Sequence, residues 1–209
     1  MNPVVFHVEA AGEFRAVELT FATEAEVRRV GTWRKMIPAT DAGEFAALAA
    51  KRWFYYTREG ATAASLEELR RAINQNARRE VAFLMVASAE WEKAHQFLAL
   101  AYCRSTWCHH LVLDFLAVRP GLSFEGQPIR GVGTGVIFGL AILADLLGVS
   151  VMWGEATASS APFYERVLGF QTVRDLFIIR RGPMERLRQR YRARLKERLA
   201  PREWRRYSS

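Results

Sequence analysis

Cysteine is scarce in this chain, with 2 residues among 209, and long apolar runs are absent. The longest uncharged apolar run extends over 14 residues, from Gly131 to Ala144, whereas a helix that spans a bilayer needs about 20. Met1 to Phe14 also lack the basic stretch and the continuous apolar segment of a secretory signal. These absences favour a cytoplasmic protein in which Cys103 and Cys108 are reduced thiols rather than a disulfide.

The body of the chain also lacks an excess of charge of either sign. The formal net charge is +8, and residues 180–209 hold 12 Arg or Lys and 3 Asp or Glu, a net of +9, which leaves a net of −1 for residues 1–179. Any argument from charge for nucleic acid or an acidic membrane therefore applies to the tail alone. With 50% hydrophobic and 25% charged residues, the chain has the composition of one folded domain with an appendage.

The hydrophobic periodicity predicts an α/β chain. An opening hairpin is expected first, and the capping pattern Ser/Thr-x-x-Glu at Thr23 and Ser65 predicts two helix starts. Another helix follows from the spacing of apolar residues between Phe45 and Tyr56, and later runs alternate between strand and helix patterns. The predicted strands cover residues 4–8, 15–21, 81–87, 97–102, 111–118, 149–153 and 172–179, and the later helices cover 136–147, ended by Gly148, and 159–168, ended by Gly169.

A glycine cluster, Gly131, Gly133 and Gly135, lies between the strand at 111–118 and the apolar helix that follows it. Glycines let a ligand approach the backbone, and the first N–H groups of a helix have no internal partner, so this layout suits a pyrophosphate. A dinucleotide fingerprint does not fit, because Val136 or Phe138 stands where its third glycine would be, and a Walker loop is excluded because no Lys-Ser or Lys-Thr follows. Tight packing of the helix on a sheet is the competing interpretation of the same glycines.

The order of motifs around this cluster resembles that of the GNAT superfamily of acyl-CoA-dependent N-acyltransferases. The loop R-x-x-G-x-G is complete, and the second signature aligns at matching spacing as Thr157, Ser160, Phe163 and Tyr164, then Gly169 and Phe170. The resemblance covers residues 111–179 and implies a mixed, mostly antiparallel sheet flanked by helices. It also implies that acetyl-CoA lies along a splayed strand and the glycine loop, held by Ala117, Val118, Arg130, Gly131, Val132, Gly133, Thr134, Gly135 and Ser160.

Transfer of an acetyl group to a primary amine needs an oxyanion site, a base and an acid. A backbone N–H on the strand that ends at Val118 would polarise the thioester carbonyl. The resemblance implies that Tyr164 protonates the departing thiolate. Asp114 is a candidate base, because it interrupts an apolar strand on the face expected to carry Val112 and Leu116. Glu155 is the second candidate. Asp114 facing solvent or paired with an arginine, and Tyr164 as a core aromatic, are the structural alternatives.

Two further residue groups have both a functional and a structural interpretation. His95, Cys103, Cys108, His109 and His110 fit none of the usual zinc spacings, so we expect no metal and treat the cysteines as packing residues. The aromatic run from Trp53 to Tyr56 either lines an acceptor pocket or fills the core. The residues that choose the amine acceptor lie in the N-terminal third and match no motif.

The tail, residues 183–209, is expected to form a basic amphipathic helix with an apolar stripe, and Pro201 is expected to stop it. The stripe consists of Met184, Leu187, Tyr191, Leu195 and Leu199. Docking of this helix on its own body or on a second subunit, as in a homodimer, competes with binding of RNA or an acidic partner.

The division expected is thus a GNAT-like domain over 1–182, with a variable helical acceptor-side region at 1–79 and an acyl-CoA core at 80–182, followed by the tail helix. The function expected is N-acetyl transfer from acetyl-CoA to a primary amine by direct attack on the thioester. The alternative is a non-catalytic interaction module on the same scaffold, which would bind RNA or an acidic partner through the tail.

Overall fold

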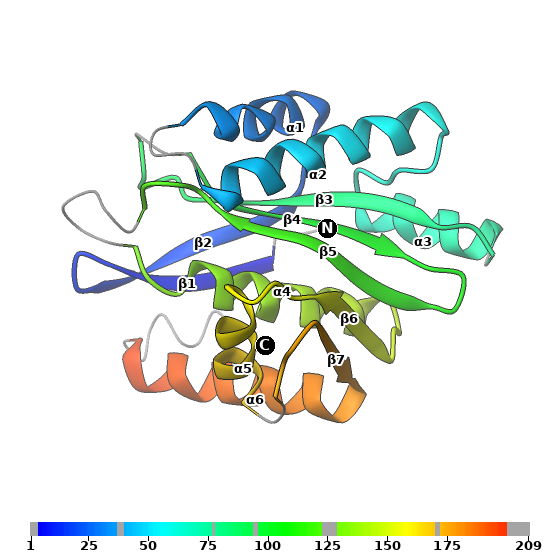
Figure 1. Cartoon of the computed structure of the whole chain (residues 1–209). Helices are drawn as coiled ribbons and strands as arrows, with labels where there is room; N and C mark the ends of the chain where they lie inside the picture. Colours follow the sequence, from blue (N-terminus) through cyan, green and yellow to red (C-terminus); the bar gives the residue numbers. More distant parts are fainter. Residues whose placement is uncertain are drawn as a thin grey trace.

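The structure is a computed structural model, and it describes residues 4–36, 40–76, 78–93, 96–122, 129–169 and 172–199. These residues form one sheet of seven strands in chain order, and every neighbouring pair is antiparallel except β5 and β6, which are parallel (Figure 1). The predicted mixed, mostly antiparallel sheet is confirmed. The strands are β1 (Val4–Ala10), β2 (Glu13–Phe21), β3 (Val81–Ser88), β4 (Phe97–Ser105), β5 (His110–Val118), β6 (Val151–Glu155) and β7 (Leu176–Arg180).

Helices cover both faces of the sheet and create two cores (Figure 1). On one face, α1 (Glu24–Val30), the 3-10 helix η1 (Gly31–Lys35) and α2 (Asp41–Arg58) pack on the central strands. The other face carries α3 (Leu66–Gln75), α4 (Val132–Leu146), α5 (Ala161–Leu168) and α6 (Arg181–Arg198). No helix in the described part of the chain is long and apolar enough to cross a membrane.

The helix ends follow the capping signals. The Thr23 hydroxyl accepts from the Glu26 N–H while the Glu26 carboxylate accepts from the Thr23 N–H, the complete capping box predicted for α1. The Ser65 hydroxyl accepts from the Glu68 N–H at the start of α3. Gly169 ends α5 with φ +66°, a conformation that L-residues with side chains rarely adopt.

The glycines at the start of α4 do not delay the helix, which begins at Val132 rather than at the predicted residue 136. A methyl group on Gly135 would lie 2.0 Å from the Phe6 ring, and one on Gly139 would lie 2.5 Å from Leu19. Both glycines therefore serve close packing of α4 on β1 and β2. The starts of β6 and α5 lie two residues later than predicted, at Val151 and Ala161, and that of β7 lies four residues later, at Leu176.

The basic tail helix docks on the body of its own chain. All five residues of its apolar stripe are buried, with Leu187 at 5% exposure. Tyr191 stacks on Phe138 of α4, with 4.0 Å between ring centroids, and its hydroxyl donates to the His7 carbonyl and accepts from the His7 N–H at 2.9 Å. The apolar stripe therefore packs on the body of the same chain, which is one of the two structural interpretations given above. The predicted stop at Pro201 lies outside the described residues.

Candidate active site

The parallel strands β5 and β6 diverge, and a cavity of about 410 Å³ lies where they separate. They pair only from His110 opposite Val151 to Leu113 opposite Gly154. Beyond that point β5 continues through residues 114–118 with β4 as its strand neighbour. We call this segment, Asp114 to Val118, the open edge of β5. The splayed strand that the family resemblance implies is thus present, and the cavity is at its wide end.

A β-bulge at Asp114 begins the open edge. Tyr102 of β4 is opposite Phe115, but the next residue of β4, Cys103, is opposite Leu113, so Asp114 is the extra residue. Phe115 consequently packs on the α2 side of the sheet with Asp114, whereas Leu116 packs on the α4 side. The expectation that Asp114 and Leu116 share a face is wrong, because the inserted residue breaks the alternation of side chains.

Two backbone N–H groups of the open edge point away from β4. The Arg119 N–H donates to the Leu98 carbonyl of β4 at 2.9 Å. Because successive amides along a strand point in opposite directions, the N–H of Val118 faces the other way, and so does that of Leu116 two residues earlier. The open edge therefore offers two donors along the line from the cavity, which Leu116 lines, towards the first turn of α4.

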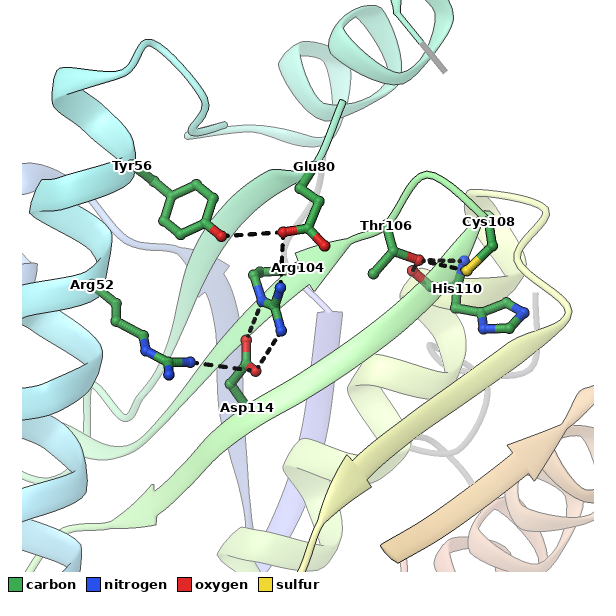
Figure 2. Close-up of polar contacts among 8 residues, drawn as sticks. All are labelled: Arg52, Tyr56, Glu80, Arg104, Thr106, Cys108, His110 and Asp114. Carbon is green, nitrogen blue, oxygen red and sulfur yellow. Dashed lines mark hydrogen bonds and ion pairs between the residues drawn. The ribbon is translucent and has the colours of Figure 1, made fainter. Parts of the chain in front are cut away.

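Asp114 lines the cavity and belongs to a chain of hydrogen bonds and ion pairs that joins α2, β4 and β5 (Figure 2). Arg104 of β4 donates to both oxygens of Asp114, at 2.7 and 2.9 Å, and to the Glu80 carboxylate at 2.8 Å. Arg52 of α2 adds a longer ion pair to Asp114 at 3.6 Å, and the Tyr56 hydroxyl donates to Glu80. The hydrogen bonds that the Asp114 carboxylate accepts from Arg104 raise the pKa of the Arg104 guanidinium above its ordinary value. Both oxygens of Asp114 are thus engaged by arginine, which is the pairing alternative stated for this residue.

Tyr164 of α5 lines the same cavity. Its ring stacks on Phe177 of β7, with 4.3 Å between centroids, and is 5% exposed. Burial raises the pKa of the Tyr164 phenol above its ordinary value of 10.0, so the hydroxyl keeps its proton at neutral pH. A buried, protonated phenol at a cavity wall is able to donate a hydrogen bond to a ligand.

The end of β6 and the start of β7 supply the remaining polar groups. Glu155 and Asp175 line the cavity, and neither has an ion pair with any residue that the structure describes. Ser160 also lines it, and its hydroxyl accepts from the Thr157 N–H at 2.9 Å. The structure therefore brings together Tyr164, Asp114, Glu155 and Ser160, all of which the sequence singled out.

The glycine turn lies apart from this cavity. Gly131 is the N-cap of α4 with φ +90°, and a methyl group there would meet nothing within 4 Å. A methyl group on Gly133 would lie 3.0 Å from Phe163 and 3.7 Å from Val118, so the far end of the open edge reaches the first turn of α4. Arg130 is fixed by two backbone hydrogen bonds to Glu9 of β1, at 2.8 and 3.0 Å. The turn thus combines space at Gly131 with packing at Gly133 and Gly135.

Some residues that the sequence singled out lie outside the cavity. Ala117 is buried against α2 and does not line the cavity. From α2 the cavity receives Phe45, whereas Trp53 fills the core below α2. Cys103 is buried, Cys108 is exposed, and His95 lies outside the described residues. Within the described ranges, no three His, Cys, Asp or Glu side chains are placed to hold a metal ion.

Sequence reasoning missed Phe45, Asp175 and the arginines Arg52 and Arg104. Phe45 and Asp175 lie 130 positions apart in the chain, and neither belongs to a motif. Arg104 had a weak signal, because it is, like Asp114, a charged residue within an apolar strand. Pairing the two requires the register of β4 and β5, which a bulge alters.

Comparison with known proteins supports the fold. The sequence matches no protein-family model and no curated protein. Among solved structures, the chain is similar to a spermidine N-acetyltransferase chimera from Vibrio cholerae and hSSAT, with a TM-score of 0.50 and 9% identity over 81% of this chain and 98% of that chain. An acetyltransferase of the GNAT family from Staphylococcus aureus has a TM-score of 0.44 and 6% identity over 79% and 99%.

A third match is shorter. Nourseothricin acetyltransferase is 19% identical with a TM-score of 0.33, and the alignment covers 41% of this chain and 48%, about half, of that one. The match to the spermidine N-acetyltransferase chimera, which covers 81% of this chain, shows that the two chains share a fold. The resemblance noted from the glycine loop and the tyrosine motif is confirmed at the level of the fold.

Proposed function

We propose that the chain is an N-acetyltransferase that transfers an acetyl group from acetyl-CoA to a primary amine. The observation that carries the proposal is the open edge of β5, which connects the cavity at Leu116 with the glycine turn at Val118 and Gly133. An extended ligand with a phosphate at one end and a reactive carbonyl at the other fits such a track. The free N–H groups of Val132, Gly133 and Thr134 would hold the pyrophosphate, with the Arg130 guanidinium nearby.

The N–H groups of Leu116 and Val118 supply the electrostatic part of catalysis. In a β-strand these two amides are about 7 Å apart, so one holds the acyl donor arm and the other, nearer the cavity, polarises the thioester carbonyl. Fixed donors of this kind stabilise a tetrahedral oxyanion by about 3 to 4 kcal/mol. The amine then attacks the carbonyl carbon, a C–N bond forms, and the C–S bond of the thioester breaks.

Two side chains handle the protons. Glu155, at the end of β6, accepts the proton that the amine loses, directly or through one water. Tyr164 donates its phenolic proton to the departing thiolate and recovers one from solvent, into which Glu155 releases the proton taken from the amine. Asp114 serves as a positioning residue, because Arg104 occupies both of its oxygens. The products are an acetamide and free CoA.

The acceptor is expected to be a cationic amine. Asp175 and Glu155 lie in a cavity whose other walls include Phe45, Phe115 and Leu176. Carboxylates attract an ammonium group, and aromatic faces favour a cation beside them. A cytoplasmic location, expected from the sequence, stays a prediction.

The experiment is a free-thiol assay with acetyl-CoA and a panel of primary amines, read out together with calorimetric binding of acetyl-CoA. The parent should bind acetyl-CoA and release thiol only when an amine is present. Tyr164→Phe keeps the ring stack on Phe177 and should lower kcat about 100-fold. Tyr55→Phe removes a hydroxyl from an exposed residue outside the cavity and should match the parent.

Failure of the parent to bind acetyl-CoA at millimolar concentration would overturn the proposal. A Tyr164→Phe variant with parental kcat would overturn the assignment of Tyr164 as the acid. A parent that binds acetyl-CoA but acetylates no amine in the panel would favour the non-catalytic module, whose RNA-binding form would show a salt-dependent affinity that is lost when residues 183–209 are deleted.

A further inference from the structure

A groove beside the first turn of α4 gathers arginines from two helices. Its volume is about 200 Å³, and it is lined by Thr134 of α4, Arg166 of α5, and Arg190 and Arg194 of α6. Among the described residues, no carboxylate lines it. A second, smaller hollow of about 40 Å³ shares Thr134, Tyr191 and Arg194 with the groove and adds Arg130 and Gly131. We call the larger of the two the arginine groove.

The arginines of this groove differ from their neighbours in lacking anionic partners. Arg188 forms ion pairs with Asp145, close to the end of α4, and with Glu185 on α6. In contrast, Arg166 and Arg194 have no ion pair with any described residue, and Arg190 donates one hydrogen bond to the Leu168 carbonyl at 3.1 Å. Three like charges around one hollow repel each other, so an anion that binds among them relieves a repulsion already present.

The groove is built on rigid parts of the fold. Tyr191 forms part of its wall, and the stack on Phe138 and the two hydrogen bonds to His7 hold this side chain in place. Leu187 lines the groove and is buried beside it. The α6 backbone that carries Arg190 and Arg194 is thus fixed against α4, which spares part of the ordering cost that binding would otherwise incur.

We propose that the arginine groove binds a phosphomonoester, and that this group is the 3′-phosphate on the ribose of the acyl donor. The inference rests on the proposed function, since the glycine turn that would hold the pyrophosphate adjoins the groove at Thr134. A phosphomonoester carries a charge of about −1.5 to −2 at neutral pH, more than either phosphate of a pyrophosphate diester. Arginine forks match its oxygens with paired hydrogen bonds. At about 30 Å³ per water molecule, the groove has room for a phosphate and part of a ribose.

The docked tail helix thereby acquires a role in the proposed reaction. It lets the enzyme distinguish a donor that carries the 3′-phosphate from an otherwise identical one that lacks it. Ligand recognition then explains part of the net charge of the tail, since Arg190 and Arg194 line the arginine groove together with Arg166 of α5.

The test compares calorimetric binding of CoA and of dephospho-CoA, which lacks only the 3′-phosphate. Each charge-assisted hydrogen bond contributes about 1.5 to 3 kcal/mol, so the parent should bind CoA about 10- to 100-fold more tightly. The double variant Arg166→Gln, Arg194→Gln should reduce this ratio to below about threefold. Arg192→Gln, Lys196→Gln removes the same charge from exposed residues of α6 outside the groove and should keep the parental ratio.

The outcomes separate this inference from the proposed function. Equal binding of CoA and dephospho-CoA by the parent, or an unchanged ratio in the double variant, overturns the groove assignment alone. Binding of neither ligand overturns both. In a further arm, adenosine 3′,5′-bisphosphate should displace CoA from the parent more effectively than inorganic phosphate does. Inorganic phosphate that competes equally well would overturn recognition of a nucleotide in favour of a general anion site.

Discussion

The two ends of the open edge of β5 carry opposite charges. At the Asp114 end the cavity is lined by three carboxylates, those of Asp114, Glu155 and Asp175. Near the Val118 end, around the first turn of α4, the groove and the adjoining hollow are lined by four arginines and one carboxylate, Glu9. The net charge of the chain is therefore less informative than the separation of negative and positive side chains between the two ends of this segment.

The two ends also differ in how their charges are compensated. At the cavity, Asp114 is held by two arginines while Glu155 and Asp175 have no ion pair among the described residues. At the groove, Arg166 and Arg194 have no ion pair among the described residues. Unpaired charges of opposite sign at opposite ends of one track suit a pair of substrates in which the acceptor is a cation and the donor a polyanion.

The largest effect is expected from the unpaired carboxylate at the cavity end. Glu155→Gln should lower kcat for amine acetylation about 100-fold while the Kd for acetyl-CoA stays unchanged, because the lost group acts on the amine alone. The deficit should shrink as the pH rises towards about 10, where a larger fraction of an alkyl amine is already neutral. Stopped-flow or steady-state thiol release over a pH series measures it.

Asp175→Asn is the matched control for that variant. It removes a charge from the same cavity and should raise KM for the amine severalfold with little change in kcat. A Glu155→Gln variant that behaved in this way, with KM raised and kcat kept, would contradict the assignment of Glu155 as the base.

The compensated carboxylate at the same end should affect stability instead. Arg104→Met leaves Asp114, 11% exposed, with the 3.6 Å contact to Arg52 as its one ion pair among the described residues. Removal of one partner from a fully buried pair costs about 3 to 5 kcal/mol, and the partial exposure of this pair reduces the expected loss to about 2 to 3 kcal/mol. Urea denaturation measures the loss. Arg28→Met, which breaks an exposed pair with Glu24 on α1, should cost less than about 0.5 kcal/mol, and equal costs would refute the distinction.

How well the sequence predicted these two ends depends on how far apart in the chain the interacting residues lie. Tyr164 and the glycine turn lie in motifs with fixed spacing inside single strand–helix units, so their positions could be predicted. Asp114 was visible as a charge in an apolar strand, but its face was not, because a bulge adds one residue without any mark in the sequence.

The arginine groove illustrates the opposite limit. The tail has arginines at every second position from 186 to 194, and the pattern does not distinguish them. Only the docking of α6 separates Arg188, paired with Asp145, from Arg194, which faces the first turn of α4. The apolar stripe could be predicted from its spacing, but the surface it covers depends on contacts with α4 and β1, far away in the chain.

At the groove end, alanine substitutions of Gly135 and Gly131 should distinguish a glycine needed for close packing from one needed for its backbone conformation. Gly135→Ala places a methyl group 2.0 Å from the fully buried Phe6, and overpacking of this kind costs about 1 to 3 kcal/mol. Gly131→Ala meets no atom within 4 Å but must adopt φ +90°, so about 1 kcal/mol is expected from backbone strain. Thermal denaturation compares the two. If Gly131→Ala proved the more destabilising, the packing role of Gly135 would be wrong.

The smallest effect concerns the anchor of α6. Burial raises the pKa of Tyr191 from 10.0 to about 12, so the folded state favours the protonated phenol. The stability that this phenol contributes is therefore complete below pH 10 and is lost as the pH rises from 10 to about 12. Tyr191→Phe keeps the stack on Phe138 but loses the hydrogen bonds to His7, at a cost of about 1 kcal/mol at neutral pH.

Because the Tyr191→Phe variant lacks the titrating group, its free energy of unfolding should fall less steeply than that of the parent between neutral pH and about pH 11. Urea denaturation measures this slope, and Tyr55→Phe is the exposed control. A variant that lost stability with pH as steeply as the parent would show that another group governs the alkaline transition. The anchoring of the groove would then depend on the aromatic stack rather than on the phenol.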